Sequence, residues 1–207
     1  MKVLVAYEFS GRVRQSFVER GHDAYSCDLL PSEISGQHLQ CDVHSLDMTQ
    51  WDLVIAHPPC TYLSNAGIRW FNEERYGDKA RERKRLRLEG MEFVLKIANS
   101  KCSKIAIENP RGWLNSHWRK PDQTVQPWMF GDEFNKPTCL WLKGLPKLTP
   151  TNIVSKGVMV THVTKKGETH TDSKWYYDAI KLPPTERQRF RSKTFQGIAN
   201  AMAEQWG

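Results

Sequence analysis

The sequence contains no long hydrophobic run: its longest apolar stretches are five or six residues, whereas a membrane-spanning helix needs about 20. The amino terminus enters "MKVLVAY" directly, without a signal-like apolar segment and a cleavage site. Internal repeats and low-complexity tracts are also absent. We therefore expect a cytoplasmic protein that does not cross a membrane, folded as one domain over residues 1–207.

Cysteine is scarce and irregularly spaced, and no two cysteines form a C-x-x-C pair. The five are Cys27, Cys41, Cys60, Cys102 and Cys139. An odd number at wide spacing argues against a zinc site and against a redox couple, so no metal is expected. Most of these thiols should be buried small side chains, and Cys60, which follows two prolines, is the exception.

The formal net charge of +7 is concentrated in two segments. Residues 69–87 hold eight basic and four acidic side chains, and residues 181–193 hold five basic and one acidic. Such segments are typical of a surface that binds nucleic acid, although two solvated faces would have the same composition. The candidate contacts are Arg81, Arg83, Lys84, Arg87, Arg189 and Arg191.

Apolar strands alternate with helical patterns in the first 110 residues. Strands that are apolar throughout indicate an α/β fold, a parallel sheet covered on both faces, in which ligands lie beyond the carboxyl ends of the strands. Those ends carry "EFSG", "SCD", "HPPC" and "ENP". The predicted strands are 2–7, 23–28, 52–56 and 104–110, and the predicted helices are 10–21 and 79–99.

The other segments are less regular. Residues 29–49 are predicted to be mostly loop, and "CLWLKG" (139–144) to be a further strand. Residues 149–180 are polar and match no pattern, and the last helix is predicted to begin at about Ile198.

Cys60 comes directly after a predicted strand and two prolines. Because each proline ring restricts the backbone, Pro58 and Pro59 hold the thiol in one direction, and a free thiol with a pKa of roughly 8.5 needs only modest activation to act as a nucleophile. A buried structural cysteine after an ordinary turn is the alternative.

Glu108, with Asn109 beside it, ends another apolar strand, where a carboxylate is costly to bury without a partner. A strand-end thiol and acid suit attack on a heterocycle, since the acid can stabilise charge on the ring nitrogen.

A cofactor site is indicated at the first strand end, where "FSG" forms a turn before a helix. Asp28 follows about twenty residues later, the spacing of a ribose-binding acid in nucleotide-binding sheets. Asp42 could hold an adenine amino group. A plain turn remains the alternative for "FSG", since phosphate-binding loops usually carry more glycines.

The chain resembles a DNA (cytosine-5) methyltransferase. "EFSG", "SCDLLP" and "CDV" are similar to the family's cofactor motifs, "PPCTYLSNAG" to its nucleophile segment, "IENPRGW" to its ENV motif and "FQGIANAMAEQ" to its C-terminal motif. The matches come in family order and cover roughly residues 1–115 and 190–206. The fold implied is a Rossmann-like S-adenosylmethionine-dependent methyltransferase sheet with helices on both faces.

The resemblance implies that Cys60 attacks carbon 6 of a cytosine in DNA, that Glu108 steadies the ring, with Asn109 in the same motif, and that carbon 5 then takes a methyl group from S-adenosylmethionine. Lys136 is the nearest counterpart of the family's glutamine–arginine motif, which helps to hold the base. The residues implied around the cofactor are Phe9, Ser10, Gly11, Asp28, Asp42, Pro58 and Asn200.

The chain also departs from the family pattern. Arg12 and Val13 stand where a second glycine is common after FSG, and Pro110 replaces the valine of ENV. Residues 149–185 form only a short insertion where relatives carry a large target-recognition domain, so a partner or a homodimer would be one way to supply further base contacts.

Other functions fit less well. Zinc-dependent cytosine deamination needs H-x-E and P-C-x-x-C, which the sequence lacks, so His57 is interpreted as a hydrogen-bonding residue at the edge of the site. Methylation of an exocyclic amine usually has an aromatic ring where Cys60 stands. Two alternatives remain open: the same chemistry on RNA or a cytosine nucleotide, and a non-catalytic methyltransferase-like nucleic-acid-binding module.

Overall fold

The computed structural model describes residues 1–163 and 167–207. Nine strands are described in these ranges: β1 (Lys2–Ala6), β2 (Asp23–Asp28), β3 (His38–Gln40), β4 (Leu53–Ala56), β5 (Ile105–Pro110), β6 (Gln123–Val125), β7 (Thr138–Lys143), β8 (Met159–Val163) and β9 (Thr169–Ser173). The α-helices are α1 (Arg12–Val18), α2 (Glu73–Tyr76), α3 (Asp78–Ala98), α4 (Trp113–His117), α5 (Lys174–Lys181), α6 (Pro184–Ser192) and α7 (Gln196–Trp206). Short 3₁₀ helices are η1 (Val43–Ser45), η2 (Met48–Gln50), η3 (Asn65–Phe71) and η4 (Pro127–Met129).

Seven strands form one mixed sheet in the order β3-β2-β1-β4-β5-β7-β6. The first five are parallel and follow the strand order of doubly wound, Rossmann-like sheets. The parallel sheet predicted for the strands of the first 110 residues is confirmed, and β7, for which the sequence predicted no direction, runs antiparallel to both β5 and β6. The ligand-binding crevice of such a fold lies between β1 and β4, where the strand order reverses.

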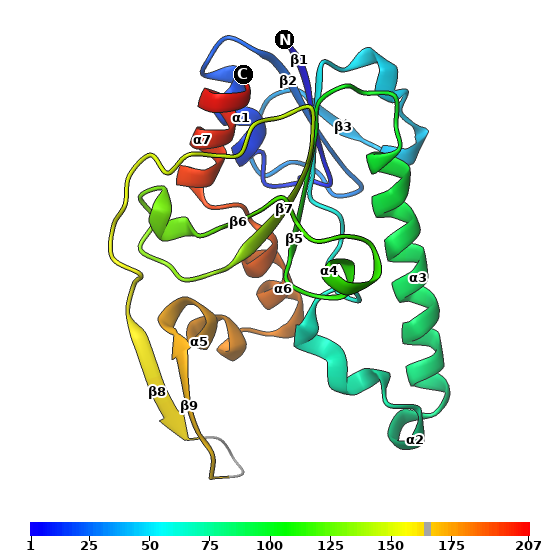
Figure 1. The fold of residues 1–207 in the computed structure, drawn as a ribbon, viewed down its shortest axis with the longest axis vertical. Coiled ribbons are helices and arrows are strands. Elements are labelled where there is room, and N and C mark those ends of the chain that lie inside the picture. The colour runs from blue at the N-terminus through cyan, green and yellow to red at the C-terminus, as the bar shows by residue number, and fades with distance from the viewer. Residues whose placement is uncertain (164–166) are drawn as a thin grey trace.

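Helices cover both faces of this sheet (Figure 1). On one face α1 and α7 pack against β1 and neighbouring strands, with Phe17, Met202 and Trp206 fully or almost fully buried. The other face is covered in part by α3, which contributes Val94 and Ile97 to a second core. Burial on both sides explains why β4 is apolar at every position.

A separate two-stranded antiparallel sheet, β8 and β9, extends away from the main sheet (Figure 1). It lies in the segment for which the sequence predicted no structure, and α5 and α6 follow it. The ribbon therefore occupies the predicted insertion 149–185.

The strands predicted from the apolar pattern are confirmed as β1, β2, β4, β5 and β7. The helix predicted at 79–99 is confirmed as α3, and α7 begins at Gln196, two residues before the predicted Ile198. The segment 29–49 is loop except for β3, η1 and η2. No helix in the described ranges is long and apolar enough to cross a bilayer.

Candidate active site

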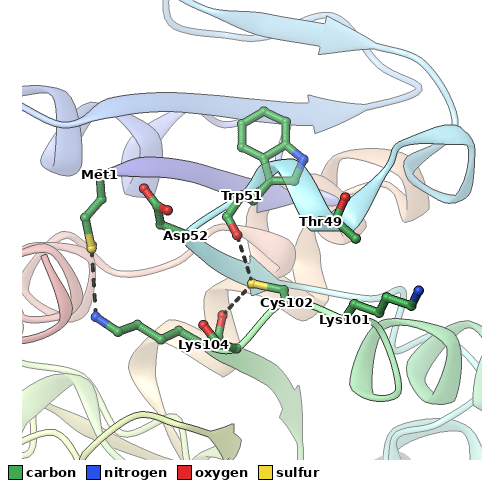
Figure 2. Close-up of a pocket in the computed structure, with 8 residues that line it drawn as sticks. Met1, Thr49, Trp51, Asp52, Lys101, Cys102 and Lys104 are labelled. Carbon is green, nitrogen blue, oxygen red and sulfur yellow. Dashed lines mark hydrogen bonds between the residues drawn. The ribbon is translucent and has the colours of Figure 1, made fainter.

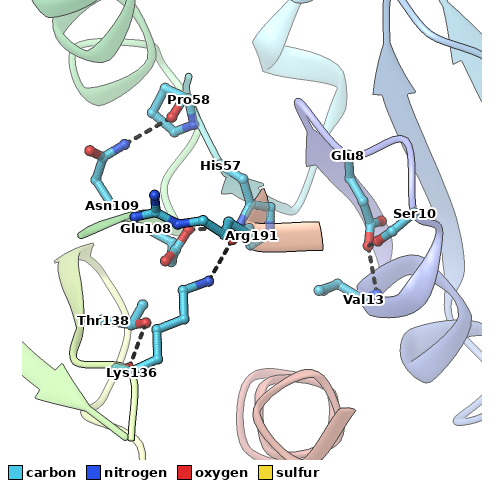
Figure 3. Close-up of polar contacts among 10 residues, drawn as sticks. All are labelled: Glu8, Ser10, Val13, His57, Pro58, Glu108, Asn109, Lys136, Thr138 and Arg191. Atoms are coloured by element: carbon cyan, nitrogen blue, oxygen red, sulfur yellow. Dashed lines mark hydrogen bonds and ion pairs between the residues drawn. The ribbon is translucent and has the colours of Figure 1, made fainter. Parts of the chain in front are cut away.

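The turn after β1 is held by a buried carboxylate that the sequence analysis did not single out. Glu8 is 4% exposed, and its carboxylate accepts hydrogen bonds from the backbone N–H groups of Val13 (2.7 Å) and Arg14 (3.2 Å) and from the Ser10 hydroxyl (3.2 Å; Figure 3). These N–H groups belong to the first turn of α1, where an acid is favourable because it satisfies unpaired donors and opposes the helix dipole. Glu8 thus orders the FSG turn from within.

Glycine is required inside that turn. Gly11 has φ of 71°, a left-handed conformation that side chains other than glycine rarely adopt. A Cβ atom there would lie 2.8 Å from the Arg14 guanidinium and 3.1 Å from Ile34. The loop after β2 therefore packs directly on the FSG turn, and Phe9, whose carbonyl accepts the Glu33 N–H at 2.8 Å, is buried beneath it.

Arg14 organises this loop. Its side chain is fully buried and its guanidinium donates to the carbonyls of Ile34 (2.8 Å) and Ser35 (3.0 Å) and to the Ser26 hydroxyl (3.3 Å). Burial lowers the pKa of Arg14, and the charge of Glu8 opposes that shift. A basic residue in an amphipathic helix is ordinarily interpreted as solvent-exposed, so the sequence carried no signal for this role.

The two predicted cofactor acids lie at the carboxyl ends of adjacent strands. The Asp28 carboxylate, at the end of β2, accepts the Leu30 N–H at 2.9 Å, and the exposed Asp42 carboxylate, after β3, accepts the His44 N–H at 2.9 Å. The Tyr7 hydroxyl contacts His44 Nε2 at 2.6 Å, and burial together with the charge of Asp42 raises the pKa of Tyr7. The structure therefore brings Asp28 and Asp42 to the same edge of the sheet as the FSG turn.

Asn200 is placed differently. Its side-chain oxygen accepts hydrogen bonds from Ser16 Oγ of α1 (2.9 Å) and from Gln196 (3.0 Å). These contacts join α7 to α1, so they explain the packing of the last helix, whereas a cofactor contact of Asn200 stays a prediction.

The nucleophile segment is tied to the neighbouring strand β5. Asn109 is 1% exposed, and its side-chain amide donates to the Pro58 carbonyl at 2.8 Å (Figure 3). The Cys60 carbonyl accepts the N–H groups of Leu63 (3.1 Å) and Ser64 (2.9 Å), which closes a turn around the thiol. Asn109 is therefore a positioning residue for the Pro-Pro-Cys turn, and Pro58 is engaged through its carbonyl.

Glu108 and His57 form a pair beside this turn. His57 Nδ1 lies 3.3 Å from Glu108 Oε2, and the two side chains are 7% and 18% exposed. This contact confirms the interpretation of His57 as a hydrogen-bonding residue. Burial by itself raises the pKa of Glu108, but the hydrogen bond and charge of His57 and the charge of Lys136 outweigh it and leave that pKa below its ordinary value.

Cys60, Lys136 and Arg191 belong to the same electrostatic cluster. Burial and the charge of Glu108 raise the pKa of the Cys60 thiol, while the positive charges of Lys136 and Arg191 oppose that rise. Lys136 Nζ donates to the Arg191 carbonyl at 2.9 Å (Figure 3), and burial lowers the pKa of Lys136. The helix α6 thus approaches the strand ends, and the structure brings together four predicted residues from four segments of the chain.

The structure places Arg87, one of the predicted nucleic-acid contacts, inside the molecule. Arg87 is 8% exposed, its Nε donates to the Tyr62 carbonyl at 2.9 Å, and its guanidinium carbon lies 3.2 Å from the Phe71 ring centroid and 4.3 Å from that of Trp113. A guanidinium enclosed by two rings and a carbonyl is not available to phosphate. It holds the segment after Cys60 against α3.

The other predicted basic residues lie nearer the surface. Arg81 pairs with Asp78 and Glu73, and Lys84 also pairs with Glu73. Arg189 pairs with Glu33 at 3.2 Å, and its guanidinium carbon lies 5.5 Å from the Phe9 ring centroid, which joins α6 to the loop over the FSG turn. Arg83 makes no ion pair within the described part of the chain and lies over Tyr62.

A pocket of about 580 Å³ lies at the opposite edge of the sheet, at the amino ends of β1, β4 and β5 (Figure 2). Its thiol, Cys102, donates to the carbonyls of Trp51 and Lys104, both at 3.3 Å, and the Lys104 ammonium contacts the Met1 sulfur at 3.9 Å. These groups are already engaged with one another. The carboxyl-end cluster is therefore the stronger candidate for chemistry.

The fold and the site together define a Rossmann-like α/β protein with a thiol and a carboxylate at the carboxyl ends of adjacent strands. No family model matches the chain, and no curated protein matches it. Among residues 1–163 and 167–207, no group of three or more His, Cys, Asp or Glu side chains is arranged to hold a metal ion.

Proposed function

We propose that this protein transfers a methyl group from S-adenosylmethionine to carbon 5 of cytosine in DNA. The observation that carries the proposal is the convergence of Cys60, in the turn after β4, and Glu108, in β5, with the cations Lys136 and Arg191. A nucleophile, a carboxylate and positive charge are what addition to a cytosine ring requires.

The pKa directions suggest how protons move. Because the pKa of Cys60 is raised and that of Glu108 is lowered, the resting site holds a protonated thiol and an ionised carboxylate. As sulfur bonds to carbon 6, the thiol proton passes to the Glu108 carboxylate, which delivers it to ring nitrogen 3. Carbon 5 becomes nucleophilic and accepts the methyl group. A water molecule then takes the proton from carbon 5. As the sulfur–carbon bond breaks, the nitrogen 3 proton returns through Glu108 to the Cys60 sulfur, and the ring is aromatic again.

The residues at the ends of β1, β2 and β3 fit the cofactor. Gly11 gives the FSG turn its left-handed backbone, and the carboxylates of Asp28 and Asp42 lie where hydroxyl and amino groups of a nucleoside would be bound. When bound, S-adenosylmethionine supplies the methyl group.

The test is an assay of labelled methyl transfer to duplex DNA, single-stranded DNA, RNA and free cytidine nucleotides. We expect transfer to DNA that Cys60→Ala abolishes without loss of cofactor binding. Cys102→Ala is the matched control, because it removes a thiol at the opposite edge of the sheet. Transfer only to RNA or to nucleotides would keep the chemistry and change the substrate, whereas transfer to none of the four would contradict the proposal.

A covalent trap tests the nucleophile itself. DNA containing 5-fluorocytosine cannot lose its ring substituent as a proton, so the active protein should remain attached to it through denaturing electrophoresis. Absence of this complex from an active preparation would show that Cys60 does not add to the ring.

A further inference from the structure

A second pocket, of about 460 Å³, lies beside the nucleophile segment. It is lined by Trp70, Tyr76, Lys79 and Arg83, which come from η3, α2 and α3. Two aromatic rings and two cations therefore line one cavity. Neither the cofactor residues nor the thiol cluster includes any of these side chains.

The rings are open to a ligand. Trp70 is 40% exposed, and its ring centroid lies 4.8 Å from that of Tyr76 at an interplanar angle of 47°. Rings inclined in this way do not cover each other's faces as a parallel stack would. Aromatic surface is therefore available for a planar group.

The positive charge around the pocket is not neutralised by neighbours. Arg81, Lys84 and Arg85 of α3 pair with nearby carboxylates. In the described part of the chain, by contrast, Lys79 and Arg83 have no ion pair, and neither do the two arginines that lie over the pocket rings. Those are Arg69, 4.8 Å from the Trp70 centroid, and Arg75, 5.5 Å from that of Tyr76.

Arg83 connects the pocket to the nucleophile segment. Its guanidinium carbon lies 4.9 Å from the ring centroid of Tyr62, two residues after Cys60, and its Nε is buried without a hydrogen-bond partner. A Cβ atom added to Gly67 would lie 2.9 Å from the Arg83 guanidinium, so glycine at that position leaves room for this placement. A buried, unsatisfied donor of a charged group is unfavourable, and an anionic ligand would relieve it.

We propose that this pocket binds an unpaired nucleotide of the nucleic-acid substrate, next to the cytosine that reaches Cys60. The base packs on Trp70 and Tyr76, and its phosphate is bound by Lys79 and Arg83. In a duplex the faces of a base are covered by its neighbours, so the pocket favours single-stranded or locally opened nucleic acid. This inference rests on the proposed function, because it assigns the strandedness of the same substrate.

The test is fluorescence anisotropy without cofactor, using a fluorescein-labelled cytosine- and thymine-containing strand of about 12 nucleotides and the duplex of the same sequence. Both are measured at one salt concentration, because phosphate contacts depend on salt. Trp70→Ala should weaken single-strand binding at least about fivefold, the lower end for one base–aromatic contact, and should weaken duplex binding less. Trp70→Phe, which keeps a ring, should restore most of the single-strand affinity.

Trp128→Ala is the control, since it removes a different ring that also lies beside a lysine, Lys156, at 5.4 Å. Three results would each overturn the pocket assignment. They are unchanged single-strand affinity of Trp70→Ala, a loss of duplex affinity equal to its loss of single-strand affinity, and an equal loss of single-strand affinity in Trp128→Ala. Methyl transfer is measured separately. Unchanged binding by Trp70→Ala with methyl transfer intact removes only this inference, whereas nucleic-acid binding that follows the prediction without any transfer removes only the proposed function.

Discussion

Replacement of Arg87 distinguishes a structural role from a nucleic-acid contact. Arg87→Met keeps much of the stem but removes the guanidinium, which donates to the Tyr62 carbonyl and lies against the rings of Phe71 and Trp113. A hydrogen bond to a charged group contributes about 1.5–3 kcal/mol, and each cation–π contact about 0.5–2 kcal/mol. Since such terms are not additive and burial of the charge opposes them, we expect a net loss of about 2–4 kcal/mol in the free energy of unfolding.

The assay is urea unfolding of Arg87→Met and Arg87→Lys beside the wild type, with thermal unfolding as a second measurement. The expected loss corresponds to a decrease of roughly 5–15 °C in Tm for a chain of this size. Arg87→Lys should also be destabilised, because an ammonium cannot reproduce the planar contacts. Arg81→Met is the matched control on the same helix, and it should change the unfolding free energy far less because its ion pairs are exposed.

One result would refute this reasoning. If Arg87→Met unfolds at the wild-type urea concentration but loses nucleic-acid affinity, and Arg87→Lys retains that affinity, Arg87 is a phosphate contact.

Three further predictions follow from the site. The pKa of Glu108 is lower in the folded state than in the unfolded chain, where it is near about 4.3. The ionised carboxylate therefore stabilises the fold above the unfolded pKa, and this stabilisation is lost as the pH falls through the lower folded pKa. Acid unfolding of Glu108→Gln should be less steep below about pH 4, and a profile identical to that of the wild type would contradict the lowered pKa. S-adenosylmethionine at a hundredfold excess over its Kd should stabilise the wild type and Cys60→Ala by about 2.7 kcal/mol but Asp28→Ala much less, and calorimetry without binding at millimolar cofactor would exclude the site. A Cβ atom on Gly112 would lie 2.1 Å from the Leu63 carbonyl. Gly112→Ala should therefore lower the free energy of unfolding by about 1–3 kcal/mol and slow methyl transfer. A Gly112→Ala variant as stable as the wild type would contradict the close approach of these two segments.

Local patterns in the sequence were enough for five of the nine described strands, whereas β3, β6, β8 and β9 were not predicted. Runs such as residues 52–56 are apolar because both sides of the strand are buried, and that composition can be recognised without the fold. Two features of the site are likewise local: Cys60 follows two prolines, and Glu108 stands at the end of an apolar run. The approach of these two segments follows from the parallel pairing of β4 with β5.

The direction of β7, the placement of α6 and the fate of individual arginines depended on tertiary structure. Arg14, Arg83 and Arg87 have the same charge and all lie on helices, yet one orders a loop, one lines a pocket and one is enclosed by two rings. A helical pattern gives the face on which a residue lies but not what packs against that face. The charge of each arginine was determined by the sequence alone, whereas its partner, and therefore its role, was decided by segments that are distant along the chain.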